Sequence, residues 1–215
     1  MSTQHLPYPA YSRPERIADG VMHALGLTAA LAGAGWLTWQ ALGGGSVSLA
    51  IYGATLVATF AASAFYHMTP WERLRPTLRR IDHAAIYLKI AGTYTPLAVL
   101  IGTVGAWAVL ATVWVLAAWG MTQKLFFWRN PHRQGTWLYL TMGWLSVLLV
   151  GSLLQVLPFA ALVLIGIGGA LYTLGTLFHH WESLRFSNAI WHGHVVAGSA
   201  CFFAAIALGM PTGTA

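Results

Sequence analysis

The chain has 215 residues, of which 57% are hydrophobic and only 7% are charged, whereas about a quarter of the residues in an ordinary soluble domain are charged. Because so few charges cannot cover the surface of a water-soluble fold, the composition indicates an integral membrane protein, and we expect an all-α one. A net charge of +6 would favour nucleic acid as a partner of a soluble protein, but membrane topology explains it here, and we expect no nucleic-acid binding. The single cysteine, Cys201, excludes an internal disulfide and a thiolate zinc site.

Seven apolar segments are long enough to cross a bilayer, which takes about 20 helical residues. We predict spans over residues 20–42, 47–67, 82–101, 104–125, 136–155, 157–178 and 189–210. Residues 1–19 form the predicted N-terminal segment, and residues 20–210 form one seven-helix domain. One lysine, Lys89, lies two turns inside the third span. We expect it to extend its ammonium group to the membrane surface, and pairing with an inward-facing carboxylate is the alternative.

The basic residues outside the spans sort by loop. The N-terminal segment and the second, fourth and sixth loops hold Arg13, Arg16, Arg73, Arg75, Arg79, Arg80, Lys124, Arg129, Arg133 and Arg185. The first, third and fifth loops and the C-terminal tail hold none. Because Lys and Arg are retained on the cytoplasmic side, the N-terminus is predicted inside and the C-terminus outside. We expect a multi-pass protein of the cell's inner (plasma) membrane, with membrane lipids as its partners.

Polar residues gather at the cytoplasmic ends of four predicted spans. They are Glu15, Asp19, His23, Ser63, His67, Asp82, His83, Asn188 and His192. Asp19 and His23 are four residues apart, as are the pairs Ser63/His67 and Asn188/His192, so each pair shares a helical face. Neutral imidazole is a good zinc ligand, and two ligands four residues apart on a helix reach one ion. A nearby carboxylate orients a ligand or takes a proton from metal-bound water. Histidines solvated at the membrane interface are the alternative.

Five segments resemble the hemolysin III family, which belongs to the progestin and adipoQ receptor superfamily and is similar in its site to alkaline ceramidases. These segments are residues 63–67, 80–87, 91–96, 142–144 and 189–193, within a match that runs from about residue 12 to residue 207. The resemblance implies seven helices, a cytoplasmic N-terminus and a zinc ion near the cytoplasmic side. Any one motif alone is weak, but their order across all seven spans is specific.

The resemblance also implies roles for individual residues. The family's Ser-x-x-x-His motif falls on Ser63 and His67, its third-span aspartate on Asp82, and its His-x-x-x-His motif on Asn188 and His192. We therefore expect His67, His192 and position 188 at the metal, and Asp82 with Ser63 in catalysis. Because asparagine stands where the family has a histidine, we expect weak zinc binding.

His194 cannot replace the missing histidine. In a helix, residues 192 and 194 lie about 200° apart, whereas residues 188 and 192 lie about 40° apart. His23 is the first candidate for a further ligand.

Three functions stay open at this point. The first is a zinc-dependent hydrolase of a lipid, at an amide bond, or a regulator of membrane lipid homeostasis that uses the same pocket. The second is a non-enzymatic receptor or sensor. The third is a membrane-lytic, hemolytic pore; the uncharged outer loops argue against it, because a pore needs a continuous polar path.

The charge pattern predicts topology directly. A reporter fused after Ala215 should lie outside the cytoplasm, and one inserted in the 71–80 segment should lie inside, because only the second site is flanked by arginines. Alkaline phosphatase and green fluorescent protein fusions measure the two locations. Finding both reporters on one side would contradict seven spans.

Overall fold

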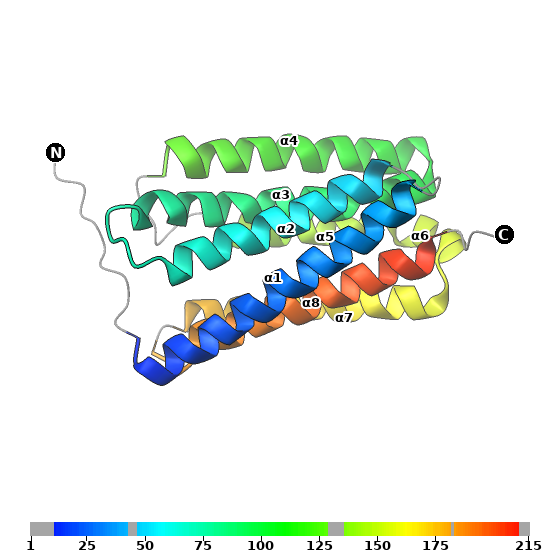
Figure 1. Ribbon diagram of the computed structural model, residues 1–215. Helices are drawn as coiled ribbons and strands as arrows, with labels where there is room; N and C mark the ends of the chain where they lie inside the picture. Colours follow the sequence, from blue (N-terminus) through cyan, green and yellow to red (C-terminus); the bar gives the residue numbers. More distant parts are fainter. Residues whose placement is uncertain (1–10, 43–46, 129–135, 182, 211–215) are drawn as a thin grey trace.

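Figure 1 shows the computed structural model, which describes residues 11–42, 47–128, 136–181 and 183–210. Among these residues there is no strand, and seven helical segments are long and apolar enough to cross a membrane, which confirms the predicted fold class. The helices are α1 Arg13–Leu42, α2 Val47–Met68, α3 Arg75–Ile101, α4 Val104–Phe126, α7 Phe159–His180 and α8 Ser187–Gly209, and the fifth span is divided into α5 Thr136–Trp144, the 3-10 turn η1 Leu145–Leu149 and α6 Val150–Val156.

Helix α1 begins seven residues before the predicted span. The sequence Ser12-Arg13-Pro14-Glu15 has the spacing of a capping box, and the structure shows the bonds of its glutamate side. The backbone N–H and the hydroxyl of Ser12 both donate to Oε2 of Glu15, at 2.9 and 2.6 Å. Asp19 therefore lies within the second turn of α1, so its side chain has the fixed direction of a helical residue. Residues 1–10 of the predicted N-terminal segment lie outside the described residues.

Helix α3 is the centre of the bundle. In its membrane window 67% of the residues are buried, against 17–44% in the other spans. It packs against α2 and α4, and also contacts α5, α6 and α8. Figure 1 shows α4 along one edge, α7 and α8 on the opposite side, and α1 crossing diagonally from α8 towards α2, with the start of α1 and the end of α8 at opposite ends of the bundle. Outward positions are apolar, as in Val104, which is 86% exposed. Such surfaces suit contact with lipid.

Small residues allow α2 and α3 to approach closely. A Cβ on Gly92 would lie 1.9 Å from Oγ1 of Thr55. One turn away, the hydroxyl of Thr59 donates to the backbone oxygen of Ala85 across the same interface, at 2.9 Å. Close packing of this kind replaces the hydrophobic effect as the force between helices in lipid.

The fifth span changes from α to 3-10 geometry where side chains bind its carbonyl groups. The hydroxyl of Tyr94 on α3 lies 2.8 Å from the oxygen of Met142 and 2.9 Å from that of Gly143. The hydroxyl of Ser146 also donates to Gly143, at 2.9 Å. The side-chain hydroxyls compete with backbone N–H groups for these carbonyl oxygens, and this competition favours the tighter 3-10 turn.

The Gly92 contact generates a stability prediction. Gly92→Ala should lower the melting temperature of the detergent-solubilised protein, because the new methyl group forces α2 and α3 apart at a cost of about 1–3 kcal/mol. Gly169→Ala is the matched control, since a Cβ there meets nothing within 4 Å. Equal melting temperatures for the two variants would show that the α2–α3 contact is not tightly packed.

Candidate metal site

Four side chains from three helices meet near one end of the bundle. Asp19 and His23 come from α1, His67 from α2 and His192 from α8, and the candidate ligand atoms of all four lie within 4.8 Å of one another. The three imidazole rings are 4.3–4.9 Å apart between centroids. Asp19, His23 and His192 are 5%, 4% and 8% exposed. We call these four residues the metal cluster.

Hydrogen bonds fix which ring nitrogen carries the proton in two of the histidines. Nδ1 of His192 lies 2.6 Å from Oδ1 of Asp19, and Nδ1 of His23 lies 2.8 Å from the backbone oxygen of Asp19. Since both oxygens only accept, each neutral ring carries its proton on Nδ1 and a lone pair on Nε2. A carboxylate that holds the far nitrogen of a histidine is the usual support of a metal ligand. Nε2 of His23 faces the hydroxyl of Ser63 at 3.2 Å.

Asn188 lies beside the metal cluster and presents its amide nitrogen. Nδ2 donates to Oδ2 of Asp19 at 2.8 Å and to Nδ1 of His67 at 3.2 Å. Nδ1 of His67 therefore has a lone pair, which accepts this hydrogen bond; a metal ion at Nδ1 would replace it. In this orientation Asn188 positions two neighbours, because an amide N–H does not bind a cation. Its role as a ligand stays a prediction.

Asp82 lies on the α3 side of the cluster. Its Oδ2 is 4.0 Å from Nε2 of His67, and its carboxylate also interacts with the hydroxyl of Ser63. Asp82 is only 8% exposed. Ser63 therefore stands between His23 and Asp82, so the two residues expected to act in catalysis lie together next to the metal cluster.

Three other polar residues point elsewhere. Glu15 accepts the backbone N–H of Phe186 at 3.1 Å. The ring of His83 packs 4.7 Å from that of Trp128. His194 donates to the backbone of its own helix, and its ring centroid lies 5.1 Å from that of Phe178 on α7. The helical angle between residues 192 and 194 predicted this direction for His194.

The sequence did not predict that Asp19 and the histidines form one set of candidate ligands. The signal was present, because Asp19 and His23 are four residues apart like the pair Ser63/His67. The α1 pair lay outside the motifs on which the resemblance rests, and the register of α1 against α8 is a tertiary feature.

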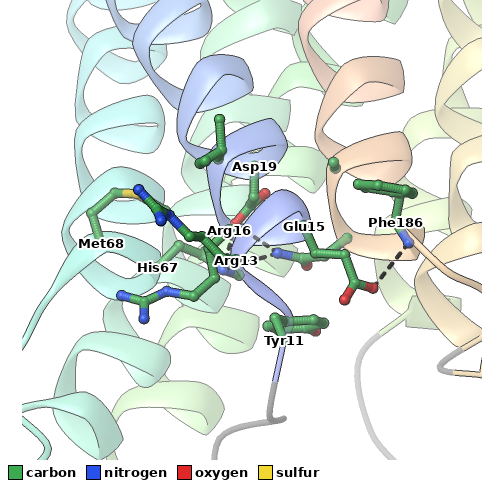
Figure 2. A pocket seen from close by; sticks show the side chains of 11 residues that line it. Tyr11, Arg13, Glu15, Arg16, Asp19, His67, Met68 and Phe186 are labelled. Atoms are coloured by element: carbon green, nitrogen blue, oxygen red, sulfur yellow. Dashed lines mark hydrogen bonds and ion pairs between the residues drawn. The ribbon is translucent and has the colours of Figure 1, made fainter.

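A pocket of about 520 Å³ reaches the cluster from the end of the bundle. Its lining includes Asp19, His67 and Asn188, with Arg13 and Arg16 nearer the surface. Figure 2 shows both arginines extending from α1 towards the Met68 side of the pocket, while Glu15 points the other way, to Phe186. Small molecules of headgroup size fit a pocket of this volume.

The fold and this site define a class: multi-pass, seven-helix membrane proteins with a buried histidine–carboxylate cluster at one end. The family model described as Haemolysin-III related matches residues 12–203. The chain belongs to this family.

Three relatives span most of the chain. The chain is 37% identical over 195 residues to the "Hemolysin-3 homolog" of Bacillus subtilis (strain 168), covering 88% of this chain and 91% of the relative. It is 35% identical over 195 residues to "Hemolysin-3" of Bacillus cereus, covering 88% and 89%. It is 27% identical over 211 residues to the human "Monocyte to macrophage differentiation factor", covering 89% and 83%.

The cluster generates a prediction about metal affinity. His23→Ala and Asp19→Ala should each weaken Zn²⁺ binding by about tenfold or more, because each removes a ligand or the support of one. His194→Ala is the matched control, since it deletes an imidazole that faces α7. Competition with a chelator in detergent measures the affinities. If His23→Ala binds as the parent protein does, His23 is not part of the metal site.

Proposed function

We propose that the protein is a zinc-dependent hydrolase of membrane lipids that cleaves an amide bond. The observation that carries the proposal is the metal cluster itself, three imidazoles and a carboxylate within 4.8 Å, reached by a pocket. A catalytic zinc ion has three protein ligands and one water, and the imidazoles of His23, His67 and His192 are such a set, with Asp19 orienting His192. When bound, zinc supplies an activated water and polarises a carbonyl group.

The surrounding residues suit the proton transfers of hydrolysis. Asp82 takes a proton from the attacking water and delivers it to the leaving nitrogen. The water oxygen bonds to the acyl carbon as the carbon–nitrogen bond breaks, giving a carboxylic acid and an amine. The hydroxyl of Ser63, between His23 and Asp82, keeps the Asp82 carboxylate in position. Asn188 holds Asp19 and His67 in their orientations.

A lipid substrate fits the location of the site. In the orientation predicted from the loop charges, the pocket mouth would lie at the cytoplasmic face of the inner membrane, where headgroups lie. Arg13 and Arg16 line the same pocket as Asp19 and His67. Guanidinium groups at this depth attract anionic headgroups by on the order of 1 kcal/mol each. A substrate would place its headgroup at the mouth and its amide bond at the cluster.

A regulatory role is the second candidate. The name of the human relative refers to differentiation and not to a reaction. A regulator would use the same pocket to bind a lipid without cleaving it.

The Bacillus relatives are named as hemolysins, which is the reason to consider a lytic pore. Large side chains fill the bundle interior, since Tyr52, Tyr87 and Met142 are 1%, 2% and 0% exposed. This packing argues against a pore through one chain.

The proposed role of Asp82 is testable by one substitution. Asp82→Asn should reduce hydrolysis of an N-acyl lipid by about 100-fold or more, because an amide keeps the shape but takes no proton. Zinc content should stay at the level of the parent protein. Glu72→Gln, the same change at an exposed loop acid, is the control. Full turnover in Asp82→Asn would favour the regulatory role.

A further inference from the structure

Two arginines from the first turns of α1, Arg13 and Arg16, line the mouth of the pocket. They are three residues apart, so their side chains are neighbours on the helix surface. Figure 2 shows both extending from α1 in the same direction, towards Met68 at the end of α2. Among the described residues, no carboxylate forms an ion pair with either arginine. Two like charges therefore lie side by side at the entrance of the cavity.

The two carboxylates that line the same pocket are engaged elsewhere. Both oxygens of Glu15 accept hydrogen bonds, one of them from the backbone N–H of Phe186 at 3.1 Å, and Figure 2 shows this side chain pointing away from the arginines. The oxygens of Asp19 accept from His192 and Asn188, at 2.6 and 2.8 Å. The pocket thus keeps its acids and its bases apart, and the Met68 side of its mouth is positive.

The helix ends around the pocket reinforce this charge. The starts of α1 and α8 both contribute to the lining, and the N-terminal end of a helix carries partial positive charge. The end of α2, where the partial charge is negative, also borders the pocket. Arg75 compensates that end, because its Nη2 donates to the backbone oxygen of Thr69 at 2.8 Å. The field of the helices therefore adds to that of the two arginines.

The arginines and the metal cluster occupy different levels of one cavity. Arg13 and Arg16 precede Asp19 by six and three residues on the same helix, which is about 9 and 4.5 Å along the axis. The cavity has a volume of about 520 Å³, several times that of one small anion. A group held by both arginines would therefore leave the cluster accessible to the rest of the same ligand.

Phosphate is the anion that suits two neighbouring guanidinium groups. Each guanidinium presents paired N–H donors in a plane, which bind two oxygens of one phosphate. A tetrahedral phosphate offers oxygens in more than one direction, so it accepts from two arginines at once. An anion between the two side chains also removes their mutual repulsion.

We propose that Arg13 and Arg16 form a binding site for the phosphate group of a ligand that enters this pocket. Under the proposed function the site specifies the headgroup of the lipid substrate as a phosphate ester, and in that respect alone the inference rests on the proposed function. Phosphate binding itself requires neither hydrolysis nor metal. Lipid headgroups and soluble phosphate esters share this chemistry, and the test separates the two sources.

The test uses the metal-free full chain in an uncharged detergent. Dihexanoylphosphatidic acid, dihexanoylglycerol and glycerol phosphate are titrated by calorimetry against the parent protein, Arg13→Gln and Arg16→Gln. Affinity for the phosphatidic acid should fall by about tenfold or more in each variant, because each loses a charge-assisted pair. Affinity for the uncharged dihexanoylglycerol should not change.

Two further variants separate a phosphate site from general attraction by surface charge. Arg73→Gln makes the same charge change at an exposed arginine outside the pocket lining, and it should bind like the parent. The double variant Arg13→Lys with Arg16→Lys keeps both charges but loses the paired donors, so its affinity should fall by about threefold or more. Because both arginines are exposed and Gln and Lys are good helix formers, all variants should melt with the parent.

The source of the phosphate follows from the third ligand. Glycerol phosphate that binds as tightly as the phosphatidic acid would identify a soluble ester, whereas much weaker binding would identify a lipid headgroup, and either result supports the site. Three results would overturn it: unchanged affinity in both glutamine variants, an equal loss in Arg73→Gln, or parent affinity in the double lysine variant. Normal phosphate binding without hydrolysis by the zinc-loaded protein would reject the proposed function and leave this site standing.

Discussion

The carboxylate of Asp19 is the interaction on which the arrangement of the site depends. Oδ1 accepts from His192 at 2.6 Å and Oδ2 accepts from Asn188 at 2.8 Å, so α1 is tied to α8. Oδ2 is also 3.5 Å from Nδ1 of His67 on α2. A buried carboxylate is costly unless its oxygens are hydrogen-bonded, and here one of the two groups that satisfy it, His192, is a candidate ligand. The stability of the helix packing and the geometry of the cluster therefore have the same origin.

The structure changes the interpretation of Asn188. In a comparison with the family motif, Asn188 replaces a histidine and so removes an imidazole ligand. In the structure its amide orients Asp19 and His67, while α1 brings a further imidazole, His23, and a carboxylate into the cluster. The side chains of the candidate metal site thus come from α1, α2 and α8.

Helix α3 connects two polar regions of the bundle. It is the most buried span, and it carries both Asp82 and Lys89 on one face. One end of that face borders the metal cluster, and the other lies among Ser199 and two aromatic rings. A central helix surrounded by protein is where ionisable groups are tolerated in a membrane. The outer helices, which face lipid, carry apolar residues at their exposed positions instead.

The sequence by itself determined the seven spans, the all-α class and the helical faces of Ser63 and His67, since apolar length and the 3.6-residue period are local properties. The Ser12–Glu15 capping box was also readable and would have corrected the start of α1. Only the tertiary structure decided that Asp19 meets His192, 173 residues away, and that Lys89 turns inward to Ser199, so the expectation that it reaches the membrane surface is wrong. The period fixes which residues share a face, but not how each helix is rotated against its neighbours. Close packing between helices, as at Gly92 and Thr55, sets that rotation.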